Sequence, residues 1–200
     1  MDSTKQNKEI AGFWEWFSKH HSELAAPSLP QQLIEDLENH LFAIHRLDWE
    51  IGPGLGTRNF FALSPRGDEK LLPLTRSIIA QAIKINNWDF YPAKPPRQWD
   101  LFFKLDVGGQ EVEVDGKLWE FVAYRFEDGT YDLIFRPNRG HKLPEDYLYW
   151  AASIILDGEM GEEKRIELIK NIEIVKSWDE TAAKSAQPVR VGLLANLLTK

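Results

Sequence analysis

The chain has 200 residues, of which 43% are hydrophobic and 28% charged, and it carries a formal net charge of −7 at pH 7. This composition is typical of globular proteins and excludes a disordered chain, and the absence of cysteine excludes disulfides, thiol catalysis and cysteine-ligated metals. The negative charge disfavours binding to nucleic acids and anionic membranes. Because neither an 18-residue apolar run nor a signal peptide is recognisable, we expect a cytoplasmic protein.

Two helices are predicted at the start of the chain. Apolar residues recur at helical spacing over residues 8–24 and again over residues 31–45. The proline-containing segment 25–30 lies between them and predicts a turn. We therefore expect the two helices to pack as a hairpin.

Two short strands are predicted next, at residues 47–51 and 59–64, because apolar and polar residues alternate there. The glycine-rich segment 52–56 between them is similar to a phosphate-binding loop in composition. It joins two strands rather than a strand and a helix, however, and Pro53 has no amide to donate, so we interpret it as a turn. A third helix follows Pro73, which is a favourable residue in a first helical turn.

Residues 99–136 have the clearest strand pattern. Runs at 100–107, 110–115, 117–127 and 130–136 are separated by Gly108-Gly109, Asp115-Gly116 and Asp128-Gly129. Such dipeptides are typical of two-residue hairpin turns, which predicts an antiparallel meander. The run at 117–127 is apolar on both faces, so we expect it to be a central strand.

The last predicted elements are helical, followed by a strand. Residues 144–157 form a helix that is apolar nearly all round, which predicts deep burial, and Gly158 and Gly161 are expected to end it. A short helix from Glu162 to Lys170 has acidic residues at its start and a basic residue at its end, as the helix dipole favours. Residues 172–175 suggest a final strand.

Together these elements predict an α+β fold. A mainly antiparallel sheet of about six or seven strands, with the meander at about 100–136, is expected to pack against the N-terminal helical hairpin and two further helical regions. We expect a single domain over residues 1–176. The tail, residues 177–200, is expected to dock on that domain or on a neighbouring subunit.

Eight tryptophans are the most unusual feature of the composition. Each can bury on the order of 200 Å² and usually needs a partner for its indole N–H. We expect Trp14, Trp49, Trp119 and Trp150 in the core, because they fall on apolar faces of predicted elements. Trp16, Trp88 and Trp99 are left with a surface role.

The segment from residue 88 to residue 99 is the first candidate binding site. Aromatic and cationic side chains alternate there with three prolines, and with Trp16 the candidate binding residues are Trp16, Trp88, Phe90, Tyr91, Lys94, Arg97 and Trp99. Rigid aromatic and arginine-containing surfaces are typical of protein interfaces. The alternative is a proline-stiffened crossover that covers a sheet edge.

Charged residues make up the other candidates. Arg136, Arg139 and His141 lie in the densest basic segment, which either holds a carboxylate or phosphate or pairs with the protein's own acids. Asp157 and Glu159 are candidate acids or bases, or the end of a helix. The carboxylates within 111–115 alternate with valines and so share one strand face, which is either a solvated face or part of a binding surface.

No motif predicts chemistry. The five histidines do not have the spacing of a metal-ligand set, and neither a nucleophile motif, a catalytic triad nor a phosphate loop is present. We therefore expect no metal and no cofactor, and lean towards a protein without catalysis.

Several short motifs resemble a group of uncharacterised bacterial domains of unknown function. They are FWEWF at 13–17, WEIGP at 49–53, WDFYPAKPP at 88–96 and LDGEMGE at 156–162. The resemblance covers roughly residues 10–176 and implies a bacterial protein. Some members are suspected of interaction or toxin-immunity roles, but the resemblance assigns no catalytic residue.

Our first functional hypothesis is a protein-binding module without catalysis; an immunity-type protein that neutralises a basic or toxin-like partner would fit the charge. The alternative is an enzyme or binder of a small anionic ligand, in which Arg97, Arg136, Arg139 and His141 converge on one pocket. A homo-oligomer whose leucine-rich tail docks on a neighbouring subunit is a third hypothesis. The hypotheses include neither nucleic acid nor membrane as a partner.

Overall fold

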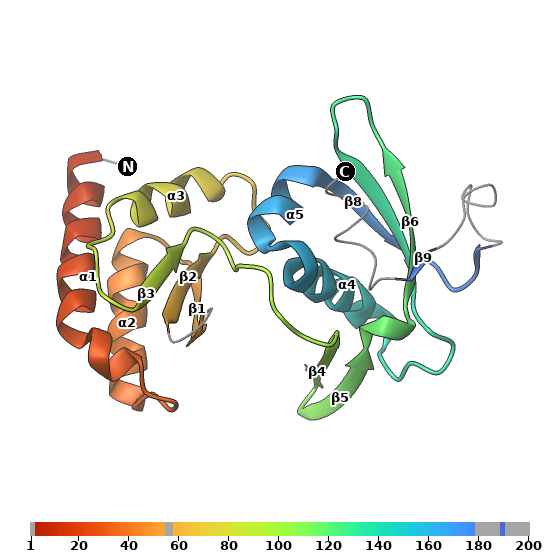
Figure 1. Ribbon diagram of the computed structural model, residues 1–200, viewed down its shortest axis with the longest axis horizontal. Helices are drawn as coiled ribbons and strands as arrows, with labels where there is room; N and C mark the ends of the chain where they lie inside the picture. The colour runs from red at the N-terminus through yellow and green to blue at the C-terminus, as the bar shows by residue number, and fades with distance from the viewer. Residues whose placement is uncertain (1–2, 55–57, 179–188, 191–200) are drawn as a thin grey trace. The chain divides into compact units, whose positions relative to one another are not determined.

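The computed structural model describes residues 3–54, 58–178 and 189–190 of the chain (Figure 1). The chain divides into two compact units, Met1–Lys94 and Pro95–Lys200, and each has its own hydrophobic core. That the two units together form one domain over residues 1–176 stays a prediction.

The first unit consists of three helices and a three-stranded sheet. The helices are α1 (Ser3–Leu24), α2 (Gln31–Ile44) and α3 (Leu72–Ala80), and the strands are β1 (Asp48–Pro53), β2 (Asn59–Ser64) and β3 (Trp88–Tyr91). The strand order is β1-β2-β3, with β1 antiparallel and β3 parallel to β2. The predicted helical hairpin is confirmed, since α1 contacts α2.

Aromatic side chains fill the core of this unit. Phe13, Trp14 and Phe17 of α1 are buried against Phe61 of β2, with ring centroids 5.2–6.2 Å from that of Phe61. The indole of Trp14 donates a hydrogen bond to the carbonyl of Ile78, at 2.8 Å. This bond satisfies the N–H that burial would otherwise leave unpaired.

The second unit contains two sheets and two helices. The strands β4 (Phe102–Val107) and β5 (Gln110–Asp115) form a two-stranded sheet, and β6 (Glu120–Arg125), β7 (Tyr131–Arg136), β8 (Ile169–Ile174) and β9 (Val189–Arg190) form a second sheet in the order β8-β7-β6-β9. The helices α4 (Glu145–Met160) and α5 (Glu162–Leu168) connect β7 to β8, which is parallel to β7. The predicted central position of β6 is confirmed. Apart from residues 177–178 and β9, the predicted tail lies outside the described residues.

The predicted α+β fold is confirmed, but the meander at 100–136 is divided between two sheets. Instead of turning back at Asp115-Gly116, the chain forms a short 3-10 turn, Gly116–Leu118, after β5. The Asp115 carboxylate accepts a hydrogen bond from the Lys117 amide and so stabilises this turn. A Cβ on Gly116 would lie 3.1 Å from the Leu101 carbonyl oxygen, so glycine is favoured here by a close approach rather than by a hairpin. The prediction of a single large sheet is wrong for this reason.

The helix α4 differs from its prediction in two respects. It is not buried all round, because Trp150 is 61% exposed, so the expectation of a core tryptophan there is wrong. Nor does Gly158 end the helix. A Cβ on this glycine would lie 2.2 Å from Cζ2 of Trp99, so Gly158 provides the space in which that indole packs on the helix. The helix ends at Gly161, whose positive φ of 84° few other residues adopt.

None of the helices in the described ranges combines the length and the apolar character that a membrane span requires.

Candidate functional site

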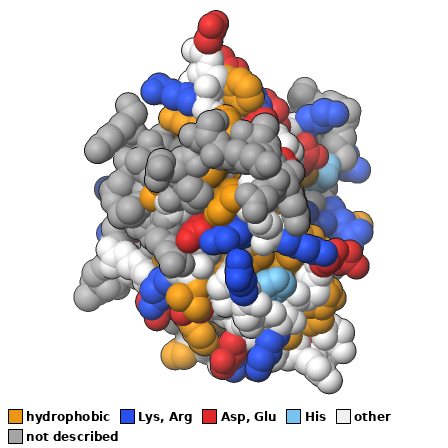
Figure 2. Space-filling view, turned by 90° about the vertical axis from the view of Figure 1, so that its right-hand side faces the viewer, with side chains coloured by type: hydrophobic (Ala, Val, Ile, Leu, Met, Phe, Trp, Pro, Cys, Tyr) orange, Lys and Arg blue, Asp and Glu red, His pale blue; other side chains and the backbone are white. Residues whose placement is uncertain are grey.

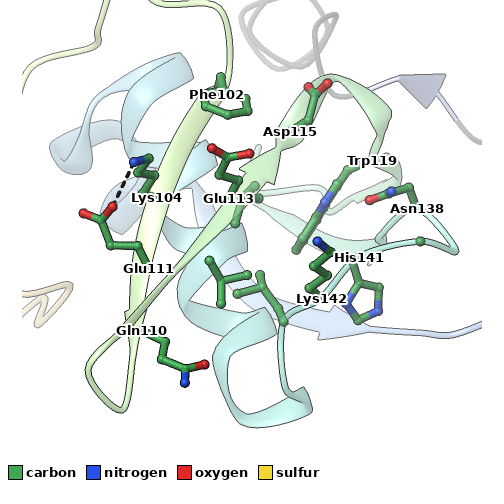
Figure 3. A pocket seen from close by; sticks show the side chains of 14 residues that line it. Phe102, Lys104, Gln110, Glu111, Glu113, Asp115, Trp119, Asn138, His141 and Lys142 are labelled. Atoms are coloured by element: carbon green, nitrogen blue, oxygen red, sulfur yellow. Dashed lines mark hydrogen bonds and ion pairs between the residues drawn. The ribbon is translucent and has the colours of Figure 1, made fainter.

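The second unit has a groove of about 600 Å³ beside β5 (Figure 3). Its lining comprises all of β5, two residues of β4, a buried tryptophan and a loop before α4; these are Phe102, Lys104, Gln110–Asp115, Trp119, Asn138 and Gly140–Leu143. Because residues from both faces of β5 contribute to it, the groove runs along the edge of that strand.

The hairpin turn determines which backbone groups of β5 face the groove. Gly108 and Gly109 both have positive φ, 63° and 87°, as a two-residue turn between β4 and β5 requires. In β5, every second residue starting with Gln110 directs its backbone N–H and C=O groups at β4. The residues between them, Glu111, Glu113 and Asp115, direct these groups away from β4. In the part of the chain that the structure describes, no strand pairs with this second edge of β5. Among the described residues this edge of β5 is thus unpaired and lines the groove.

The side chains on the outer face of the hairpin are mainly acidic. The strand register places Asp106, Glu111, Glu113 and Asp115 on one face with Lys104, four carboxylates against one ammonium, which gives this face a net charge of −3. Lys104 donates a hydrogen bond of 2.8 Å to Glu111, and this bond raises the pKa of the lysine. Lys104, Glu111, Glu113 and Asp115 of this face line the groove, and we call them the acidic wall.

The opposite wall is the loop from Asn138 to Leu143. Its backbone turns at Asn138, whose carbonyl accepts a hydrogen bond from the His141 amide at 3.1 Å. The side chains of His141 and Lys142 are exposed, and among the described residues neither forms a salt bridge or a side-chain hydrogen bond. We call this segment the loop wall. The two walls carry opposite charge, and no described ion pair joins them across the groove.

Trp119 contributes to the lining of the groove from within the core, and Figure 3 shows its ring edge-on. The residue is 0% exposed, and its indole nitrogen has no hydrogen-bond partner, a property that among the described side chains it shares with the buried hydroxyl of Tyr124. A buried donor without a partner costs about 1–3 kcal/mol. The groove thus contains an unused donor in its wall.

The candidates of the 88–99 segment are divided between the two units. In the first unit Trp88 is only 4% exposed, so its predicted surface role is wrong; Phe90, Tyr91 and Lys94 are half-buried. Trp88 packs on Phe17 with ring centroids 5.1 Å apart, because β3 is the third strand of a sheet that faces the α1 core. Trp88 therefore stabilises the core of this unit, whereas a binding role for the half-buried Phe90, Tyr91 and Lys94 stays a prediction.

Trp16 is half-buried on α1 and has imidazole neighbours. Its ring centroid lies 5.0 Å from that of His20 and 5.1 Å from that of His40 of α2. The structure thus places Trp16 at the junction of α1 and α2.

In the second unit, Arg97 and Trp99 pack on the end of α4. The Arg97 guanidinium lies 5.9 Å from the Trp99 ring centroid. The backbone amide of Arg97 donates a hydrogen bond of 2.8 Å to the Gly158 carbonyl. The Trp99 indole donates to Glu159 at 3.2 Å. Partial burial raises the pKa of the Glu159 carboxyl, and the hydrogen bond from Trp99 offsets part of this effect. Asp157, the neighbouring candidate, forms a salt bridge with Arg165 of α5.

The basic segment 136–142 is also divided. Arg136 pairs with Glu120 of β6 and lies 5.6 Å from the ring centroid of Trp178, so its charge is used within the sheet. Arg139 is exposed on the loop. The anionic-ligand hypothesis involves four cationic residues. Of these, His141 lines the groove, whereas Arg97, Arg136 and Arg139 do not.

The groove contains residues that were not among the sequence candidates. Lys104 could have been found, because the alternation at 102–107 puts it on the same strand face as the carboxylates of its hairpin partner. Trp119 was predicted as core and is buried as expected; no pattern in the sequence indicates that its N–H has no partner. Across the described ranges, no three or more His, Asp or Glu residues are grouped so that they could hold a metal ion.

No protein-family model matches this chain, no curated protein matches it, and neither does any solved structure. The resemblance to a bacterial domain family of unknown function therefore stays a prediction, and the argument for function depends on the groove.

Proposed function

We propose that this protein is a binding module whose groove takes an extended segment of a protein partner as an additional strand beside β5. The observation that carries the proposal is the unpaired edge of β5, which lines the groove over its whole length. A strand added to such an edge forms main-chain hydrogen bonds, and its side chains then determine specificity.

The charge of the acidic wall defines the partner. A strand beside β5 places alternate side chains on the face that carries the net charge of −3. Lysine or arginine at these alternate positions would pair with Glu113 and Asp115, whereas acidic residues would be repelled. The partner segment is therefore basic on one face, in agreement with the overall charge of −7.

The anionic-ligand hypothesis has less support. It requires four cationic groups at one pocket, but Arg136 is paired with Glu120, and Arg97 lies over Trp99. The groove itself has a predominantly acidic wall, which would repel a small anion along most of its length.

The proposal can be tested with a displayed library of random nonapeptides presented as internal segments, so that no free terminus is offered. We expect selected peptides to have Lys or Arg at alternate positions, and their affinity to fall as salt is raised because charges contribute to it. Selection without such a pattern, or no enrichment, would refute the proposal.

Two substitutions at Glu113 distinguish how much the main-chain hydrogen bond and the side-chain charge each contribute to affinity. Glu113→Pro removes both the N–H that faces the groove and the carboxylate, and proline is tolerated at such a position on an edge strand. Glu113→Gln removes the charge alone. We expect Glu113→Gln to weaken the selected peptides a few-fold, and Glu113→Pro to weaken them at least about tenfold, by the loss of a main-chain hydrogen bond as well. Glu127→Gln, at an exposed carboxylate in the turn between β6 and β7, is the matched control and should leave affinity unchanged.

A further inference from the structure

The loop wall has the properties of a carboxylate-binding site, and we infer that the segment taken by the groove contributes a carboxylate to it. The inference rests on the proposed function, because it assigns a second recognition element to the same groove. The carboxylate is either the C-terminus of the partner chain or an aspartate or glutamate side chain in it.

The first argument is the unpartnered donor. Trp119 is completely buried, it lines the groove, and its indole nitrogen has no partner among the described residues. The seven other tryptophans include Trp14, Trp99 and Trp178, which all donate to oxygen atoms of the protein. A ligand that supplies an acceptor at Trp119 would satisfy a donor that the fold leaves unpaired.

The second argument is the charge of the neighbouring loop. Lys142 and His141 line the same groove and have no described ion-pair partner within 4.0 Å, although Glu113 and Asp115 lie on the opposite wall. Figure 3 shows these loop side chains next to the indole of Trp119, across the groove from Glu113. The ammonium of Lys142 and the neutral N–H of Trp119, which both belong to residues lining the groove, would be two donors to one acceptor group.

The chemistry of the two walls together selects a carboxylate over a phosphate. A carboxylate carries one charge and has two oxygen atoms, which can accept one hydrogen bond each from an indole N–H and an ammonium. A phosphate carries a charge of about −1.5 to −2, so the carboxylates of the acidic wall would repel it more strongly. A ligand that presents basic side chains to the acidic wall and a single carboxylate to the loop wall matches the charge of both walls.

The experiment uses one peptide selected from the library in three synthetic forms. These are the free C-terminal acid, the C-terminal amide, and the amide with one added Asp as its last residue. Fluorescence anisotropy compares their affinities for the full chain, for Lys142→Met, and for Lys117→Met as a matched control outside the groove lining. We expect the acid, the Asp-amide or both to bind roughly tenfold more tightly than the plain amide, as a charge-assisted hydrogen bond allows.

The variants and one spectroscopic signal complete the test. Lys142→Met should remove this advantage, and Lys117→Met should retain it. In ¹H–¹⁵N spectra the indole N–H of Trp119 should move downfield with the carboxylate forms only, whereas that of Trp178, already bonded to Glu120, should not move.

The outcomes distinguish the two proposals. If the three forms bind equally and Lys142→Met has no effect, the carboxylate site is refuted, while strand addition at β5 stands. If none of the forms binds, the proposed function itself is refuted. If only the acid gains affinity, the source is a chain terminus; if the Asp-amide gains as much, the source is a side chain.

Discussion

Gly158 occupies a helical position where alanine is normally more stable by about 1 kcal/mol. Here a Cβ would lie 2.2 Å from Cζ2 of Trp99, so Gly158→Ala must displace the indole. Overpacking costs about 1–3 kcal/mol, so we expect a net loss in the free energy of unfolding of about 1 kcal/mol, measured by urea denaturation. Gly12→Ala in α1 is the matched control, because nothing lies within 4 Å of its added Cβ, and it should stabilise. Equal effects of the two substitutions would contradict the packing described.

The raised pKa of Glu159 predicts that its contribution to the free energy of unfolding depends on pH with a sign opposite to that of most carboxylates. Because partial burial raises its pKa in the folded state, the folded protein binds more protons than the unfolded one between the ordinary value of 4.5 and the raised value. Stability is therefore lost as the pH rises through this window. We expect Glu159→Gln, whose amide oxygen can still accept from Trp99, to be more stable than the wild type at pH 7. In urea denaturation curves the difference should shrink as the pH falls through this window towards 4.5; a difference that does not change with pH would exclude this origin.

At the scale of elements, the junction of α4 and α5 depends on an ion-pair group. Arg165 of α5 forms a salt bridge with Asp157 of α4, lies 3.9 Å from Glu162, and is only 13% exposed. Arg165→Met would leave both carboxylates without this partner, and we expect a loss of about 3 kcal/mol in the free energy of unfolding. Arg165→Met combined with Asp157→Asn should recover part of the loss. A single variant as stable as the wild type would show that the pair contributes nothing.

The elements also show what local pattern can and cannot predict. The amphipathic periods of α1 and α2 identified both helices, because their apolar stripes form one core. The dipeptide Asp115-Gly116 is misleading as a turn signal, since its glycine is favoured by the close approach of the Leu101 carbonyl and not by a hairpin. Gly158 was misread for the same physical reason. In both cases the decisive contact comes from a residue distant in the sequence, which periodicity does not encode.

The candidate site could be predicted in parts but not as a whole. The carboxylates of 111–115 and the basic loop were both recognisable from the sequence, each as a separate surface. Their meeting at one groove depends on the switch of the chain from one sheet to another after β5. Trp119 was correctly expected to be buried, but an absent hydrogen-bond partner is a property of the fold alone.

On the scale of the whole molecule, two units with separate cores predict independent folding. Phe13, Trp14 and Phe61 belong to one core, and Trp119 and Phe135 to another. We expect fragments 1–94 and 95–200 each to show native-like circular dichroism and a cooperative urea transition. Should neither fragment fold alone, the chain would instead be the single domain that the sequence predicts.

The packing of Trp99 on Gly158 also has an evolutionary consequence. The two positions are 59 apart in the chain, yet a side chain at one occupies the space left empty at the other. Enlarging residue 158 costs stability while residue 99 is tryptophan, and a small residue at 99 removes this cost. We therefore expect the two positions to change together among the descendants of this sequence, with a smaller residue at 99 preceding a larger one at 158 more often than the reverse.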